Sequence, residues 1–153
     1  MRYSIDTSAL MEAEVRHYPQ AIFPTLWGNL QTLVDAGALV ASEEVANELS
    51  RDPGTLNDWC RAHARMFVTS DARIQGHVGR LITTYTGFVL ATGQSGGDPF
   101  VVAVAIEHNL TVVTQERRVG PGGGRPKIPN VCAAEGVPCI TLLEMIRREG
   151  WTF

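Results

Sequence analysis

The sequence predicts an α/β domain with a parallel central sheet and helices on both faces, and three observations lead to this. Short apolar and β-branched runs alternate with longer helical stretches along the whole chain. Capping residues and glycine or proline breakers separate the two kinds of segment. The 153 residues suit one ordinary domain, and neither a linker nor an internal repeat divides them. We therefore expect a single domain over residues 1–153.

Four short apolar runs are typical of strands buried in a parallel sheet. They cover Tyr3–Asp6, Ala38–Ala41, Leu110–Thr114 and Val137–Ile140. Helical stretches separate successive runs, as the crossover connections between parallel strands require.

Helices in the first half have recognisable ends. Leucines at helical spacing indicate a helix from about Pro24 to Ala36, closed by Gly37. Ser42 is a suitable N-cap for a helix that ends before the breaker Asp52-Pro53-Gly54. From Leu56 to Leu90 the pattern is helical but interrupted, with Ser70-Asp71 as a cap and with glycines inside the stretch.

In the second half, Asp98 as N-cap and Pro99 as first helical residue predict a helix with an almost wholly apolar run. We expect that helix to be deeply packed. Gly120–Pro129 holds four glycines and three prolines in ten residues, which predicts a mobile loop. A short helix near 128–135 and a final helix follow, the latter opened by a Thr141–Glu144 capping box.

The composition excludes several classes of protein. Apolar residues make up 44% of the chain and charged residues 19%, which supports a real core. The net charge of −3 argues against binding nucleic acid through a global basic field. No apolar run approaches the roughly 20 residues of a membrane-spanning helix, and the N-terminus lacks a signal-peptide pattern, so we expect a cytoplasmic protein. The three cysteines have neither disulfide nor zinc-site spacing.

Acidic residues fall where the predicted strands end, which is where open α/β sheets carry their sites. Asp6 ends the first strand, Asp98 opens the apolar helix, and Glu116 follows the strand that ends at Thr114. Glu48 flanks the buried stripe of the helix after the second strand, and Glu44, one turn earlier, could take its place.

Crowded carboxylates repel one another unless a cation compensates their charge. Oxygen ligands of this kind suit Mg²⁺ or Mn²⁺, which can activate a water and stabilise charge on a phosphodiester. Each acid also has a purely structural interpretation. Asp6 and Asp98 are good helix caps, and Glu48 and Glu116 fit solvated surface positions.

The order of these segments resembles that of PIN-domain proteins, in the small single-domain branch that includes the VapC-type toxins. The resemblance runs from Tyr3 to about Ile146, and the start IDTSAL and the segment VVTQE are its most specific parts.

This resemblance implies a metal-dependent endoribonuclease. Thr114 would orient a ligand or a water, and Glu116 stands where the family usually has Asp. RNA would be the substrate, and an antitoxin protein and a second copy of the chain would be partners. One or two Mg²⁺ or Mn²⁺ ions would be held by the matched acids Asp6, Glu48, Asp98 and Glu116.

Basic residues gather just after Glu116 and could contact RNA phosphates, or could simply be solvated. They are Arg117, Arg118, Arg125 and Lys127. The alternative function is a non-catalytic PIN-fold protein that binds RNA or a regulatory partner. A receiver domain fits poorly, because it needs a phosphorylatable Asp at the end of a central strand and Asp52 and Asp58 follow helices instead. A haloacid-dehalogenase-like phosphatase fits poorly, because it needs a second Asp where this chain has Ser8.

Overall fold

Five short parallel strands form the central sheet of the computed structural model, which describes residues 1–153. The strands lie in the order β3-β2-β1-β4-β5, and every neighbouring pair is parallel. They are β1 (Tyr3–Ile5), β2 (Leu39–Ser42), β3 (Phe67–Val68), β4 (Thr111–Val113) and β5 (Cys139–Ile140). The expected fold class is confirmed.

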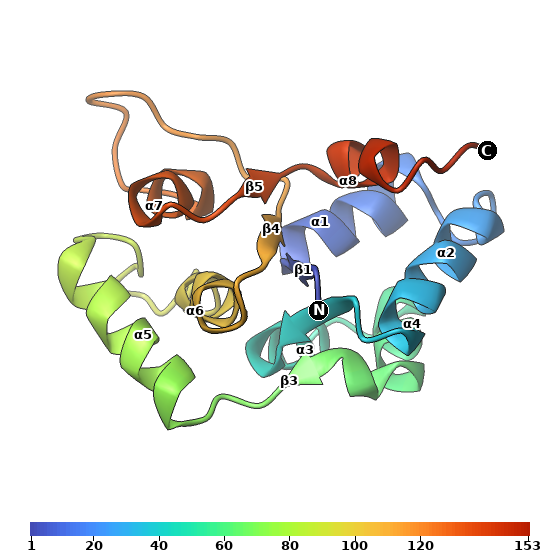
Figure 1. The fold of residues 1–153 in the computed structure, drawn as a ribbon, viewed down its shortest axis with the longest axis horizontal. Coiled ribbons are helices and arrows are strands. Elements are labelled where there is room, and N and C mark those ends of the chain that lie inside the picture. Colours follow the sequence, from blue (N-terminus) through green and yellow to red (C-terminus); the bar gives the residue numbers. More distant parts are fainter.

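Eight α-helices flank the sheet, with α5, α6 and α7 on one side of it and α1, α2 and α8 on the other (Figure 1). None of the helices combines the length and apolar content that a membrane crossing requires. A π-helical turn (Ala13–His17) extends α1, and a 3₁₀ turn (Ala64–Met66) precedes β3. The helices are α1 (Thr7–Glu12), α2 (Pro24–Asp35), α3 (Glu43–Leu49), α4 (Thr55–Ala62), α5 (Ala72–Thr84), α6 (Asp98–His108), α7 (Ile128–Glu135) and α8 (Leu142–Arg148).

Helix α6 is the most deeply packed helix, as its apolar run predicts. It contacts β1, β2 and β4 through one side and α5 through another, and seven of its residues are buried. The Ser4 hydroxyl of β1 donates to the carbonyl of Val101, which ties the helix to the central strand. Because α6 is held so firmly, the position of its first residue, Asp98, is well defined.

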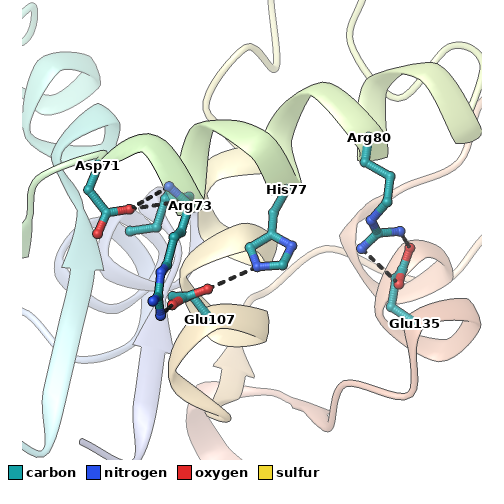
Figure 2. Close-up of polar contacts among 7 residues, drawn as sticks. Asp71, Arg73, His77, Arg80, Glu107 and Glu135 are labelled. Atoms are coloured by element: carbon teal, nitrogen blue, oxygen red, sulfur yellow. Dashed lines mark hydrogen bonds and ion pairs between the residues drawn. The ribbon is translucent and has the colours of Figure 1, made fainter.

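Ion pairs fasten α5 to its two neighbours on the same side of the sheet (Figure 2). Arg73 and His77 both contact Glu107 near the end of α6, at 3.2 and 3.0 Å. Arg80 contacts Glu135 at the end of α7 at 2.7 Å. The helix layer over this face is thereby joined laterally as well as through the core.

Two expectations about local structure are wrong in part. The stretch from Leu56 to Leu90 contains the helices α4 and α5, and α5 begins after its expected cap Asp71, but β3 lies between the two helices and irregular turns follow Thr84. Strand β3 has only two residues and exists because it pairs with the edge of β2, a contact that local propensity does not report. Asp98 is not the N-cap of α6. Gly97 takes that position, and Asp98 is the first helical residue.

The strand order explains where a site can form. From β1 the chain moves outward to β2 and β3, and then returns to the other side of β1 as β4. In open α/β sheets, a crevice forms beyond the carboxyl ends of strands at such a reversal. The register pairs Ile5 of β1 with Val113 of β4, so the next residues, Asp6 and Thr114, emerge side by side into this crevice.

Candidate functional site

A cleft of about 600 Å³ opens at the carboxyl ends of β1 and β4. The structure brings to it all four acids that the sequence singled out, from four different segments of the chain. Its walls are completed by Glu44, Arg51 and the glycine-rich turn 93–97. The four acids are Asp6, Glu48, Asp98 and Glu116.

Asp6 lies at the floor of the cleft and is 5% exposed. Its Oδ2 accepts a hydrogen bond from Ser8 at 2.5 Å and another from Thr114 at 3.0 Å. Burial raises the pKa of Asp6, and these two hydroxyl contacts oppose the rise. Both hydroxyls bind the same oxygen, and the backbone N–H groups of Ser8 and Thr7 also oppose the rise of the pKa. Ser8 is a site residue that was not predicted from the sequence. It could have been recognised as a hydroxyl side chain two positions after Asp6.

Glu48, rather than Glu44, is the acid engaged in the site. The hydroxyl of Thr7 donates to its Oε2. Its other oxygen lies against Gly97, where a Cβ would collide with it. Burial raises the pKa of Glu48, the Thr7 contact opposes this, and the neighbouring charge of Asp6 adds to the rise. The carboxylate is thus held between α1 and the start of α6.

Asp98 is the acid of the cleft whose carboxylate most clearly lacks a hydrogen-bond partner. It is 8% exposed, and its Oδ2 is buried without any hydrogen-bond partner. Burial raises the pKa of Asp98 to about 8, with further contributions from the charges of Glu116, Asp6 and Glu48. A buried carboxylate oxygen without a donor is costly, so this position favours either a proton or a bound cation.

Glu116 has a structural partner as well as a place in the cleft. Its Oε2 accepts from the backbone N–H of Ile128 at 2.9 Å, at the beginning of α7. A carboxylate is favourable there because the first N–H groups of a helix have no partner within the helix. Thr114 supports this acid too, because its hydroxyl accepts from the backbone N–H of Glu116 at 3.1 Å.

The donor set fits a hard divalent cation such as Mg²⁺ or Mn²⁺. All four acids offer carboxylate oxygens, and Asp98 Oδ2 has no other partner. No three His, Cys, Asp or Glu side chains, however, stand close enough together to form a ready metal-binding group. Glu48 and Glu116 are turned toward Thr7 and Ile128. Binding an ion would therefore require one or both of these longer side chains to swing inward.

The basic residues expected to act together after Glu116 are separated in the structure. Arg117 lines a hollow that Glu116 also lines, whereas Arg118 lines a different hollow with Pro121 and Pro126. Arg125 donates to the carbonyl of Phe88 at 3.2 Å and to Ser95 Oγ at 3.0 Å. Its guanidinium thus connects the glycine-rich segment 120–127 to the turn that lines the cleft.

Lys127 is partly buried directly before α7. Asn130, in the first turn of that helix, accepts from the backbone N–H of Lys127 at 3.2 Å and of Val119 at 3.0 Å. Its amide also donates to the Val119 carbonyl at 2.8 Å. Through Asn130, these contacts join Val119 and Lys127, which lie at the two ends of the glycine-rich segment.

Comparison with known proteins places this architecture in a family. Residues 3–153 match the family model of DUF4411, which is described as a domain of unknown function. The chain belongs to the DUF4411 family. No curated protein matches the chain. The DUF4411 match includes all five strands and all four acids of the cleft, so the site lies wholly within the family's domain.

Proposed function

We propose that this DUF4411 protein is a metal-dependent endoribonuclease that hydrolyses RNA phosphodiesters in the acidic cleft. The buried, unpartnered Oδ2 of Asp98 carries this proposal. It faces the same cleft as three other carboxylates, and their charges help to raise its pKa. A divalent cation would supply the missing partner and offset the mutual repulsion of the acids.

Some residues of the chain would hold the metal ions, and others orient the carboxylates that hold them. Asp6, Glu48, Asp98 and Glu116 would hold one or two Mg²⁺ or Mn²⁺ ions. Ser8 and Thr114 orient Asp6, and Thr7 restrains Glu48. Such ions lower the pKa of bound water and polarise phosphoryl oxygens. The fixed position of Asp6 matters because the geometry of ligands around a hydrolytic centre tolerates only small displacements.

The biological setting that we propose follows from the resemblance to VapC-type PIN proteins. It is a cytoplasmic toxin that cleaves RNA, is restrained by a cognate antitoxin and forms a homodimer. The start IDTSAL and the segment VVTQE support this proposal. In the structure these two segments supply Asp6, Ser8, Thr114 and Glu116, which lie together in one hydrogen-bonded group.

An RNA cleavage assay with matched carboxamide variants tests the nuclease proposal. Wild-type protein should cleave RNA with Mg²⁺ or Mn²⁺ and lose the activity in EDTA. Asp6→Asn and Asp98→Asn should each lower the rate at least about 100-fold. Asp58→Asn removes an exposed carboxylate of α4 outside the cleft and should cleave like wild type. Equal cleavage by all four proteins would identify a contaminating nuclease and remove the proposal's basis.

A non-catalytic RNA- or protein-binding role is the second candidate, and one observation favours it. Glu116 is already bound to the backbone of Ile128, and no three acids form a ready metal group. Glu116→Gln separates the two functions because the amide oxygen can still accept from Ile128. A nuclease should lose most of its rate in this variant with little change in melting temperature. A purely binding protein should show no metal-dependent cleavage even as wild type.

A further inference from the structure

Arg51 is the single arginine or lysine that lines the acidic cleft. It follows the last turn of α3, and its exposed side chain makes no hydrogen bond or ion pair within the protein, although its charge lowers the pKa of Glu48. No hydrogen bond or ion pair fixes this guanidinium in one position. It is therefore free to bind an anion that enters the cleft.

The cleft continues beyond Glu116 into two adjoining hollows of about 320 and 510 Å³. Glu116 lines the cleft and both hollows. Ser8 and Met11 border both the cleft and the first hollow, and Arg16 borders both hollows. These shared walls define one groove, which we call the Arg51–Arg117 groove after the residues at its two ends.

The far end of this groove is accessible and carries Arg16 and Arg117 beside the acid Glu12. Arg117 is exposed and makes no ion pair. Arg16 contacts Glu12 at 3.5 Å with 71% of its side chain exposed, an arrangement that contributes little to stability. The side chains of Arg16 and Arg117 are held less firmly than that of Arg125, which donates hydrogen bonds to Phe88 and Ser95.

The groove thus has cations at both ends, with Glu12 beside those at the far end, and buried acids in its middle. A phosphate that approached the centre without a cation would be repelled by Asp6, Asp98 and their neighbours. Phosphates on either side of the centre would instead meet Arg51 at one end and Arg16 and Arg117 at the other. This alternation of charge suits a linear polyanion that spans the centre.

We propose that a single strand of RNA lies along the Arg51–Arg117 groove, with backbone phosphates bound by Arg51 on one side of the acids and by Arg16 and Arg117 on the other. The proposal rests on the proposed function, because it places the scissile phosphate over the acids. A single strand is favoured because Asp6 and Asp98 are more than nine-tenths buried, so the backbone must bend into the cleft to reach them. A stiff duplex cannot follow that path without deformation.

Salt-dependent binding of a labelled single-stranded RNA of about 12 nucleotides tests this proposal. Fluorescence anisotropy in EDTA, between 50 and 200 mM KCl, keeps cleavage out of the measurement. Arg51→Gln should weaken binding several-fold and reduce the slope of log K against log salt by about 0.7. The double variant Arg16→Gln/Arg117→Gln should reduce the slope by about 1.4. Arg61→Gln, at an exposed arginine of α4 outside the groove, should bind like wild type.

The outcomes distinguish this proposal from the nuclease proposal. Wild-type cleavage with unchanged binding by the arginine variants would overturn the groove assignment and leave the nuclease standing. Loss of binding in the variants without any cleavage by wild type would support the groove and remove the nuclease. Absence of RNA binding by wild type, both in EDTA and with added Mn²⁺, would overturn the groove. Equally tight binding of the matching duplex RNA would overturn the single-strand assignment. Melting temperatures near that of wild type confirm that each variant is folded.

Discussion

The hydroxyl of Thr114 donates to Oδ2 of Asp6 at 3.0 Å, although 108 residues separate the two along the chain. Their contact follows from the parallel register of β1 and β4, which pairs Ile5 with Val113 one step earlier. The same hydroxyl accepts from the backbone N–H of Glu116. Thr114 therefore couples two of the four acids to the central pair of strands, and the geometry of the cleft depends on the register of the sheet.

Thr114→Val preserves the shape of the side chain and removes this contact. We expect Mn²⁺ to bind about 10-fold more weakly, because partners that orient ligands typically contribute this much to affinity. Cleavage should fall at least in parallel. Thr114→Ser restores the hydroxyl and should recover most of both losses. Isothermal titration calorimetry with Mn²⁺ measures the effect, and equal affinity in the valine variant would show that Ser8 alone holds Asp6 in place.

Asp98→Asn should stabilise the metal-free protein at alkaline pH. The folded-state pKa of Asp98 is raised from 3.8 to about 8, chiefly by burial and next by the charge of Glu116. A group with a raised pKa makes its full contribution to the free energy of unfolding below its unfolded-state pKa. For Asp98 this contribution is lost as the pH rises through about 8. The advantage of the asparagine variant should therefore grow between about pH 4 and 8 and then level off.

We expect this advantage to reach on the order of 2 kcal/mol at pH 9, since water in the open cleft screens part of the shift. Guanidinium unfolding in EDTA at pH 5, 7 and 9 measures it, with Asp58→Asn as the control. A constant difference across this range would contradict a raised pKa at Asp98. Saturating Mn²⁺ should reverse the order of stability, because only the wild-type carboxylate gains a partner from the ion.

Gly97→Ala should disturb the site more than the fold. A Cβ at this position would collide with Oε1 of Glu48 and lie 3.1 Å from its Cδ, whereas the backbone, with φ −77° and ψ −25°, accepts alanine. The carboxylate must move, so cleavage should fall by about 10-fold or more while the free energy of unfolding changes by about 1 kcal/mol or less. Gly76→Ala, in an open position within α5, is the matched control and should keep full activity. Unchanged cleavage by the Gly97 variant would place Glu48 outside the reaction.

The ion pairs of α5 should support stability without affecting catalysis. Contact with Arg80 lowers the pKa of Glu135, and the phenol of Tyr85 acts in the same direction. A lowered pKa contributes stability above the unfolded-state value of 4.5 that is lost as the pH falls further. Glu135→Gln should therefore lower the free energy of unfolding at pH 7 by up to about 1 kcal/mol, and by nothing measurable at pH 3. Activity should stay unchanged, and a loss of cleavage would imply that the α5–α7 contact controls the cleft.

Several structural features could be predicted from local sequence patterns. The β-branched runs identify four of the five strands to within two residues, and the Thr141–Glu144 capping box forms as expected. The apolar stretch after Asp98 indicates a deeply packed helix, which α6 is. Asp6, Asp98 and Glu116 could be singled out because each follows or opens a predicted element, and Glu48 because it flanks the buried stripe of a predicted helix. Each of these sequence patterns spans only a few residues. Backbone preference and hydrophobic periodicity act over the same short distance, so the patterns could be recognised without the tertiary structure.

Other features depend on contacts between distant segments. Strand β3 exists because the edge of β2 pairs with it. Ser8 and Thr7, which as isolated hydroxyls suit a helix cap, bind Asp6 and Glu48 instead. The basic residues near Glu116 are close in sequence, yet Arg125 turns to Phe88 and Ser95, while Arg117 joins Arg16 in the groove.

The sequence by itself therefore determined the α/β class, most element positions and three of the four candidate acids, with Glu48 left open against Glu44. Only the tertiary structure decided which partner each acid holds: Thr114 for Asp6, Thr7 for Glu48, Ile128 for Glu116 and none for Oδ2 of Asp98. The physical reason is that backbone conformation responds mainly to neighbouring residues. The environment of a side chain, by contrast, is set by strand register and helix packing, which join segments up to a hundred residues apart.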